Sequence, residues 1–349
     1  MNQNKKIRDY GITIGNIPIG KNNSITDVKG VKVGHVTLDD GEIKTGVTAI
    51  LPHEGNMFKD KLVAASHVIN GFGKTTGLIQ IEELGTIETP IILTNTLSIG
   101  TAYDAVVRYM LERNDDIAKT TSTVNPIIGE CSDSDLNDIR ALNVTKEDVF
   151  NAIENCDVHF LEGNVGAGTG MICYDLKGGI GSSSRIVKLG NQDYTIGVLV
   201  LSNFGSLEDF VIRGNSIGKK IKDKLSIDVS TEEKGSIVTI LATDIPLSSR
   251  QLKRVIRRIQ SGIARTGSFI GNTSGEVCIG FSTANIIKHY QPDDIISINL
   301  LNETMIDKVF KATVEATEEA IINSMVCSST TIGRDNKKVY SLKDFDSFL

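Results

Sequence analysis

The sequence has neither an excess of positive charge nor a long hydrophobic run. Lysine and arginine number 37 against 43 aspartate and glutamate residues, so the formal net charge at pH 7 is −6. Non-specific binding to nucleic-acid phosphates needs a positive field, which this balance of charges does not supply. The longest apolar segments, such as residues 196–201, have the length of a strand and not of a membrane span. We therefore expect neither a nucleic-acid partner nor a membrane partner.

Cysteine and histidine are too few and too scattered for the common disulfide and metal frameworks. The five cysteines are an odd number, lie far apart and form no CxxC pair, which is typical of reduced thiols in the cytosol. No two of the five histidines stand four residues apart with a carboxylate, so no metal site on a helix is indicated. Residues 1–20 contain Lys5, Lys6 and Arg8 but no apolar stretch after them, unlike a secretion signal. These features predict a cytoplasmic protein without a metal site.

The composition that is present belongs to a globular protein with a sizeable core. Hydrophobic residues make up 40% and charged residues 23% of 349 positions, a length that allows two domains or one large α/β or α+β unit. Short β-branched runs alternate with longer amphipathic patterns, which predicts layers of strands and helices. We expect strands at residues 47–51, 91–94, 195–201, 237–242 and 277–281, and helices at residues 101–112, 145–155, 250–265 and 303–325.

Residues 207–235 interrupt this alternation. The segment becomes polar and charged between two strand patterns and is rich in lysine between positions 219 and 224. We predict an exposed loop here, which is where a chain is most easily cut.

Two glycine-rich stretches match nucleotide-binding loops only in part. Residues 73–75 (GKT) end like a phosphate-binding loop, but Val68 stands where the motif requires its first glycine. Residues 162–170 (EGNVGAGTG) lack the last glycine of a dinucleotide fingerprint, because Met171 occupies that place. Together with residues 177–181 (KGGIG), these glycines indicate close backbone contacts around a pocket or a tight turn.

Two serines are candidate nucleophiles, and the first is Ser216. Residues 214–218 (GNSIG) match G-x-S-x-G, which forms a nucleophile elbow when a strand precedes the serine and a helix follows it. Asp244 and His289 follow in the chain order of a Ser-Asp-His triad. The lysine-rich stretch after Ser216 has poor helical periodicity, which weighs against the elbow. A serine esterase based on Ser216 is one alternative.

The second candidate, Ser236, needs no histidine. After cleavage between Gly235 and Ser236, the serine would carry a free α-amine with a reference pKa of about 7.7–8.0, which suits a general base acting on the serine's own hydroxyl. Gly235 has no Cβ and can adopt the strained backbone that lets the hydroxyl attack the preceding carbonyl. Gly-Ser also occurs at Gly181, Gly205 and Gly267, so the spacing alone leaves an ordinary turn as the alternative.

Longer blocks in a fixed order carry a more specific signal. They are residues 25–35 (ITDVKGVKVGH), 89–96 (TPIILTNT), 162–170 and 177–181, the Gly235-Ser236 pair, residues 242–247 (ATDIPL) and residues 281–283 (FST). In these blocks, which span most of the chain, the sequence resembles the L-aminopeptidase/D-esterase and β-peptidyl aminopeptidase family of self-processing N-terminal-nucleophile hydrolases.

The resemblance implies an αββα four-layer sandwich, an α/β (α+β) fold, in a single domain of residues 1–349. It also implies cleavage between Gly235 and Ser236. The large fragment 1–235 and the small fragment 236–349 would stay associated, and processed units would form homo-oligomers. The layered fold agrees with the strands and helices expected above.

The resemblance also implies the catalytic roles of four residues. Ser236 would be the nucleophile. Ser274 and Glu276, in a Ser-Gly-acid pattern, would orient its amine and relay its proton. Asn203, in an Asn-aromatic-Gly element, would hold the oxyanion.

Two further residues are implied to contact the substrate. Glu130 would bind the substrate's free ammonium, a role that suits a buried carboxylate. Ser132 stands where some members of the family have an aromatic residue or asparagine, so it would influence the size of the pocket.

The implied function is that of an aminopeptidase or amidase which needs no metal or cofactor. It would release N-terminal amino acids from small peptides, amides or esters through an acyl-enzyme on Ser236. Besides the Ser216 esterase, the alternative is a non-catalytic protein of the same fold that binds a small ligand in its glycine-rich pocket.

Overall fold

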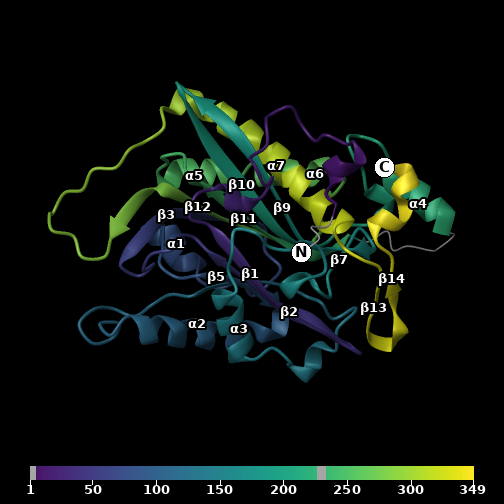
Figure 1. Ribbon diagram of the computed structural model, residues 1–349, viewed down its shortest axis with the longest axis horizontal. Coiled ribbons are helices and arrows are strands. Elements are labelled where there is room, and N and C mark those ends of the chain that lie inside the picture. The colour runs from purple at the N-terminus through teal and green to yellow at the C-terminus, as the bar shows by residue number, and fades with distance from the viewer. Residues whose placement is uncertain (1–4, 226–232) are drawn as a thin grey trace.

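The computed structural model describes residues 5–225 and 233–349 (Figure 1). The strands are β1 Lys32–Asp40, β2 Ile43–Leu51, β3 Asp60–Asn70, β4 Thr86–Ile87, β5 Ile91–Asn95, β6 Ile127–Cys131, β7 Ile172–Cys173, β8 Leu176–Lys177, β9 Gly179–Leu189, β10 Gln192–Asn203, β11 Lys234–Thr243, β12 Thr273–Lys288, β13 Thr331–Ile332 and β14 Lys338–Val339. The α-helices are α1 Leu78–Leu84, α2 Ile99–Arg113, α3 Lys146–Glu154, α4 Ile217–Leu225, α5 Ser249–Ile256, α6 Ile259–Arg265 and α7 Ile306–Val326. None of these described helices is long and apolar enough to cross a lipid bilayer.

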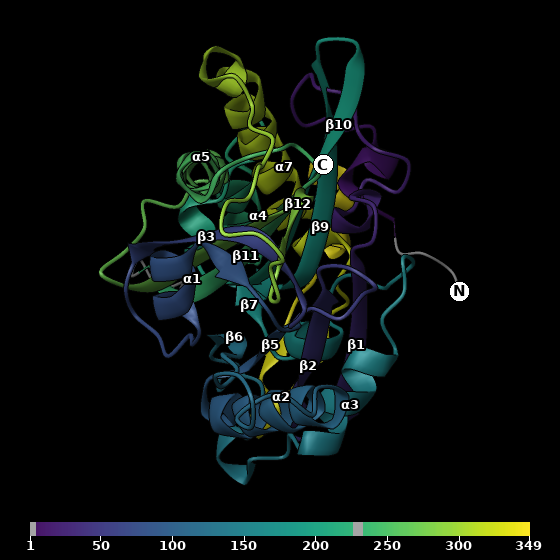
Figure 2. The same cartoon turned by 90° about the vertical axis from the view of Figure 1, so that its left-hand side faces the viewer.

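Two sheets pack face to face between two layers of helices (Figures 1 and 2). One sheet has the strand order β1-β2-β5-β6, and the other has the order β4-β3-β12-β11-β10-β9. Helices α2 and α3 cover the outer face of the four-stranded sheet. Helices α5 and α7 cover the outer face of the six-stranded sheet, with α6 packed against α7. The predicted αββα arrangement is therefore confirmed.

The alternation of apolar side chains along its central strands explains why the six-stranded sheet is covered on both faces. In β10, Val198 and Val200 pack toward the outer helices, whereas Leu199 and Leu201 pack toward the other sheet. Successive side chains of a strand point to opposite faces, so an unbroken apolar run is buried on both sides.

The predicted strands and three of the four predicted helices are present. The single helix expected over residues 250–265 is wrong, because the structure has two shorter helices there. The chain forms α5 and α6, with a turn at Arg257 and Arg258 between them. Helix α5 packs on β3 and β12, while α6 packs on α7. The change of direction buries Ile256 and Ile259, which lie on either side of the turn. A continuous amphipathic pattern in the sequence does not show that its two halves pack against different surfaces.

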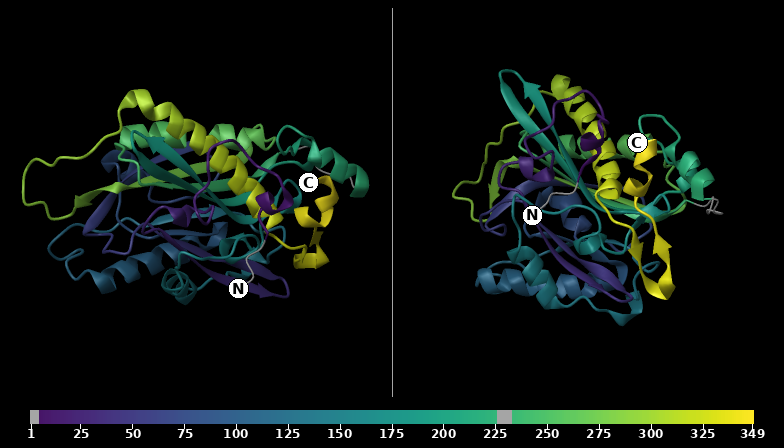
Figure 3. Two further views of the ribbon diagram at one scale, coloured as in Figure 1. Left: turned by 45° about the horizontal axis from the view of Figure 1, so that its top comes forward. Right: turned by 45° about the vertical axis from the view of Figure 1, so that its right-hand side comes forward.

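The exposed loop expected over residues 207–235 is also wrong in its first part. A short 3-10 helix at Leu207–Asp209 and helix α4 pack on the core, and Phe210 and Ile221 are fully buried. Helix α4 lies beside the C-terminal segment of the chain (Figure 3), where the ammonium of Lys224 lies 5.4 Å from the ring centre of Phe345. Residues 226–232 of the expected loop lie outside the described residues.

Candidate active site

Three adjacent strands meet at one edge of the six-stranded sheet and bring four of the predicted site residues together. Strand β10 runs antiparallel to β11 and pairs Asn203 with Ser236. Strand β12 runs parallel to β11 and pairs Gly275 with Ser236. Because β10 ends where β11 and β12 begin, Asn203 and Ser236 lie beside Ser274 and Glu276, which flank Gly275 along β12.

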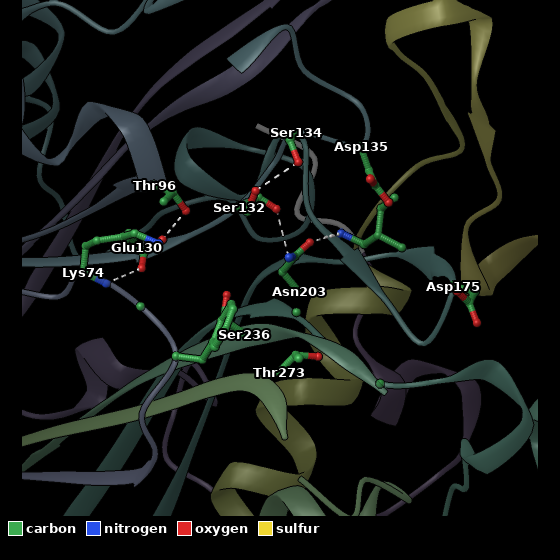
Figure 4. A pocket seen from close by; sticks show the side chains of 15 residues that line it. Lys74, Thr96, Glu130, Ser132, Ser134, Asp135, Asp175, Asn203, Ser236 and Thr273 are labelled. Atoms are coloured by element: carbon green, nitrogen blue, oxygen red, sulfur yellow. Dashed lines mark hydrogen bonds between the residues drawn. The ribbon is translucent and has the colours of Figure 1, made fainter. Parts of the chain in front are cut away.

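A cavity of about 580 Å³ lies at this edge (Figure 4). Both sheets contribute to its wall, because Glu130 comes from β6 of the smaller sheet while Asn203 and Ser236 come from the larger sheet. The residues that line it are Phe72, Gly73, Lys74, Thr96, Glu130, Ser132, Ser134, Asp135, Ile172, Asp175, Asn203, Gly205, Gly235, Ser236 and Thr273. Ser274 and Glu276 are buried behind this wall.

The Gly235–Ser236 pair adopts a backbone that only glycine tolerates at its first position. Gly235 has φ +123°, and a Cβ there would lie 2.0 Å from the carbonyl oxygen of Asn203. Any other residue would clash with the neighbouring strand. The side chain of Ser236 is 8% exposed and lies at the cavity.

Cys131 is a neighbour of the Ser236 side chain that the sequence does not reveal. Its side chain interacts with that of Ser236, and its thiol donates a hydrogen bond to the carbonyl of Leu201 at 3.5 Å. Burial raises the pKa of this thiol, so Cys131 stays protonated and is a poor nucleophile.

Ser274 and Glu276 form a buried hydroxyl–carboxyl pair. The Ser274 hydroxyl donates to Oε1 of Glu276, and both side chains are fully buried. Burial raises the pKa of Glu276 to about 7, and the negative charge of Glu233 adds to this effect. Among the described residues, the second oxygen of Glu276 has no hydrogen-bond partner. A carboxyl group that titrates near neutral pH can take up and release a proton during catalysis.

Asn70, at the end of β3, fixes the start of β12. Its amide nitrogen donates to the carbonyls of Gly271 at 3.1 Å, Asn272 at 3.3 Å and Ser274. Sequence analysis missed this residue because it contacts the site only through backbone carbonyls, and such contacts leave no motif.

The side-chain amide of Asn203 is held at both ends. Its oxygen accepts a hydrogen bond from the backbone N–H of Ile172 at 2.8 Å, and its nitrogen donates to the carbonyl of Ser132 at 2.9 Å (Figure 4). An amide nitrogen carries two hydrogens, so one remains for a ligand in the cavity.

Glu130 is a buried carboxylate held by neutral donors. It is 5% exposed and accepts hydrogen bonds from the backbone N–H of Lys74 at 2.8 Å and from the hydroxyl of Thr96 (Figure 4). The described ion pairs do not include it. A buried carboxylate is favoured when a cation neutralises it, so its place in the cavity wall suits a cationic ligand group.

Ser132 lines the cavity between Glu130 and Asn203. Its hydroxyl donates to that of Ser134 at 3.1 Å (Figure 4), so two small polar side chains form this part of the wall. The pocket is consequently wider here than an aromatic residue would allow.

The structure does not assemble the triad that was considered for Ser216. Ser216 is exposed, and it follows a turn at Arg213 and Gly214 where an elbow requires a strand. Asp244 accepts from the backbone N–H of Thr195, and the His289 ring is hydrogen-bonded to Thr121.

Comparison with known proteins gives consistent matches along nearly the whole chain. The model of peptidase family S58 matches residues 23–339. The β-peptidyl aminopeptidase BapA of Sphingosinicella xenopeptidilytica is 37% identical over 358 aligned positions, which cover 97% of this chain and 88% of that protein.

Solved structures are similar over the same extent. The crystal structure of the PH0078 protein from Pyrococcus horikoshii OT3 has a TM-score of 0.94 and 52% identity, and the match covers 99% of this chain and 98% of that one. The L-aminopeptidase D-Ala-esterase/amidase of Ochrobactrum anthropi has a TM-score of 0.90 and 36% identity, with 98% and 96% covered. The latter is described as a prototype for the serine aminopeptidases and a variant of the Ntn-hydrolase fold.

Proposed function

The chain belongs to peptidase family S58 and is a serine-type aminopeptidase, and from this premise we propose that it cleaves itself between Gly235 and Ser236 and then uses Ser236 as an N-terminal nucleophile. In self-processing, Oγ of Ser236 attacks the carbonyl carbon of Gly235 and the peptide C–N bond breaks. Water then hydrolyses the resulting ester, which leaves the carboxylate of Gly235 and the α-amine of Ser236. The glycine-only backbone of Gly235 beside the buried Ser236 supports this step most directly.

The processed enzyme transfers an acyl group to Ser236. The hydroxyl attacks the carbonyl that follows the substrate's N-terminal residue, the α-amine takes the hydroxyl proton, and the leaving amine or alcohol receives a proton as the bond breaks. The free hydrogen of the Asn203 amide and a backbone N–H stabilise the oxyanion. Water then attacks the acyl-enzyme and releases the amino acid. No step requires a metal or cofactor.

Ser274 and Glu276 orient the α-amine and exchange its proton. Ser236, which carries the amine after cleavage, pairs with Gly275, between these two residues along β12. The pKa of Glu276, about 7, is close to that of a free α-amine, so a proton passes between the two groups at small cost.

Glu130 binds the substrate's ammonium group, so the substrates are small peptides, amides or esters with a free N-terminus. The names of the similar proteins, a β-peptidyl aminopeptidase and a D-Ala-esterase/amidase, support amide and ester substrates. The small Ser132 and Ser134 leave room beside the ammonium site.

We also propose that the processed units assemble into homo-oligomers. The segment between β12 and α7 extends beyond the sandwich (Figure 3) and exposes Ile295, Ile296 and Leu300 to solvent. Apolar groups on such an extension favour contacts with another chain. Light scattering on the processed protein gives the number of units.

Intact mass under denaturing conditions tests self-processing. Because 235 of the 349 residues precede the cut, the 37.8 kDa chain should yield fragments of about 25 and 12 kDa, the smaller one with Ser236 as its N-terminus. Ser236→Ala should remain a single chain without activity. Ser216→Ala is the matched control and should process and work normally. An intact wild-type chain after prolonged incubation, or an inactive Ser216→Ala, would contradict the proposal.

A further inference from the structure

Lys177 carries a buried amino group that the proposed mechanism does not use. Its side chain is fully buried, and Nζ donates to the carbonyls of Met171 at 2.6 Å, Gly178 at 2.8 Å and Gly168 at 3.0 Å. The three hydrogens of an ammonium group are thus all used, and the described ion pairs give it no carboxylate partner. Burying an ammonium without a counter-ion is costly, so its position needs a reason.

One of these three carbonyls leads to the candidate oxyanion donor. The carbonyl of Met171 and the N–H of Ile172 belong to the same peptide group. This N–H donates to the side-chain oxygen of Asn203 at 2.8 Å, and the Asn203 nitrogen lies at the cavity. Lys177 and the cavity are therefore connected by two amide groups in series, the Met171–Ile172 peptide and the Asn203 side chain.

The hairpin of β7 and β8 holds the Met171–Ile172 peptide in place beside Asn203. The N–H of Gly178 donates to the carbonyl of Met171 at 3.0 Å, which closes the base of the hairpin. At its tip the N–H of Tyr174 donates to the carbonyl of Phe204, the residue after Asn203, at 2.7 Å. The peptide that contacts Asn203 is consequently fixed to the end of β10.

We propose that Lys177 is a positioning residue that strengthens Asn203 as an oxyanion donor through the Met171–Ile172 peptide. A positive charge at the Met171 carbonyl draws electron density from the Ile172 N–H, which becomes a stronger donor to the Asn203 oxygen. The Asn203 amide is polarised in the same direction, so its free N–H donates more strongly to the developing oxyanion. This inference rests on the proposed function, in which Asn203 faces the oxyanion.

The contribution of Lys177 depends on pH. Burial lowers the pKa of Lys177 to about 7, against the opposing effects of Cys173, Asp133 and Asp39, the acidic groups that face it. The ammonium form is therefore lost as the pH rises through about 7, and the benefit of Lys177 should fade above that pH.

A double-mutant cycle with Asn203 tests the connection. On an amino-acid p-nitroanilide with a free amine, Lys177→Met should lower kcat about tenfold with KM nearly unchanged, which is less than the loss of a direct oxyanion donor. In an Asn203→Ala background the same substitution should change kcat less than twofold. The wild-type to Lys177→Met ratio of kcat should also fall between pH 6 and pH 9, since ionisations common to both proteins cancel. Equal losses in both backgrounds, or a change in KM alone, would overturn the inference.

Two further variants separate charge from structure. Lys177→Gln keeps N–H donors for the buried carbonyls but removes the positive charge, so its kcat should be low. This variant keeps the test valid even if Lys177→Met fails to fold. Full activity of Lys177→Gln would overturn the role of the charge. Lys61→Met removes another mostly buried lysine, which lies on β3 and pairs with Glu88, and should lower stability without lowering kcat. Any activity of Ser236→Ala, or an Asn203→Ala variant as active as the wild type, would overturn the proposed function itself. Additive effects of Lys177 and Asn203 would overturn only the role of Lys177.

Discussion

Two buried carboxylates at the site differ in what surrounds them, and this difference assigns them different chemistry. Glu130 accepts a backbone N–H and a hydroxyl and faces the cavity. Glu276 accepts only from Ser274 among its described partners and has a raised pKa. Glu130 is consequently suited to hold a cation, and Glu276 to exchange a proton.

The raised pKa of Glu276 predicts a pH-dependent effect on stability. A buried carboxyl with a pKa above its ordinary value binds its proton more tightly in the folded state, so stability is lost as the pH rises from about 4.5 to about 7. In the Ser236→Ala chain, which keeps the uncleaved state, adding Glu276→Gln should leave the melting temperature unchanged at pH 5 and raise it at pH 8.

A partly exposed carboxylate, that of Glu303, provides the control for this measurement. Hydrogen bonding from Arg250 holds the pKa of Glu303 at about 2, so Glu303 does not titrate between pH 5 and pH 8. Glu303→Gln should therefore shift the melting temperature by the same amount at both pH values. A shift for Glu276→Gln that is equally independent of pH would show that Glu276 is ionised throughout.

At the scale of elements, the local sequence pattern predicts which segments are strands and helices, but not the surface against which each one packs. The strands around Ser236 were predictable because their apolar β-branched runs are buried on both faces. The break between α5 and α6 and the burial of residues 207–225 depend on tertiary contacts that no local period records. For the same reason the family resemblance implies roles for Ser236 and Asn203, but none for Asn70 or for Lys177 at the start of the block 177–181. Both of these side chains act through backbone carbonyls.

The role of Asn70 in positioning β12 can be tested against a matched residue, because an asparagine amide donates to a backbone carbonyl near each end of this strand. Asn70→Ala removes the donor that holds the start of β12, so Ser274 should shift, and both processing and kcat should fall by about tenfold as positioning is lost. Asn285→Ala is the matched control. Asn285 donates to the carbonyl of Asn299 at 2.9 Å near the other end of β12. Both variants should lose about 1 kcal/mol of stability, and equal activity losses would contradict a positioning role for Asn70.

At the scale of the whole molecule, the two proposed fragments are interleaved. Strands β11 and β12 of fragment 236–349 lie between β3 and β10 of fragment 1–235, so backbone hydrogen bonds join the fragments on both sides. Helix α7 of the small fragment packs across β9 and β10 of the large one. Cleavage at Gly235 would therefore create two new chain ends without separating the fragments.

A buried ion-pair network links the same two fragments and predicts how they come apart. Arg185 on β9 pairs with Glu319 at 2.7 Å and with Glu315 at 3.4 Å, both on α7, and Arg8 also pairs with Glu319. Arg185→Met leaves these glutamates buried with less compensation, so the free energy of unfolding should fall by about 3–5 kcal/mol.

Because the strands as well as the ion pairs join the fragments, they should separate only when the fold is lost. On heating the processed Arg185→Met protein, light scattering and circular dichroism should therefore change together, at a lower temperature than for the wild type. Arg250→Met, which removes an exposed partner of Glu303, should melt like the wild type. Release of the small fragment from Arg185→Met while the circular dichroism is still native would contradict this view. It would mean that the ion pairs, and not the shared sheet, hold the two fragments together.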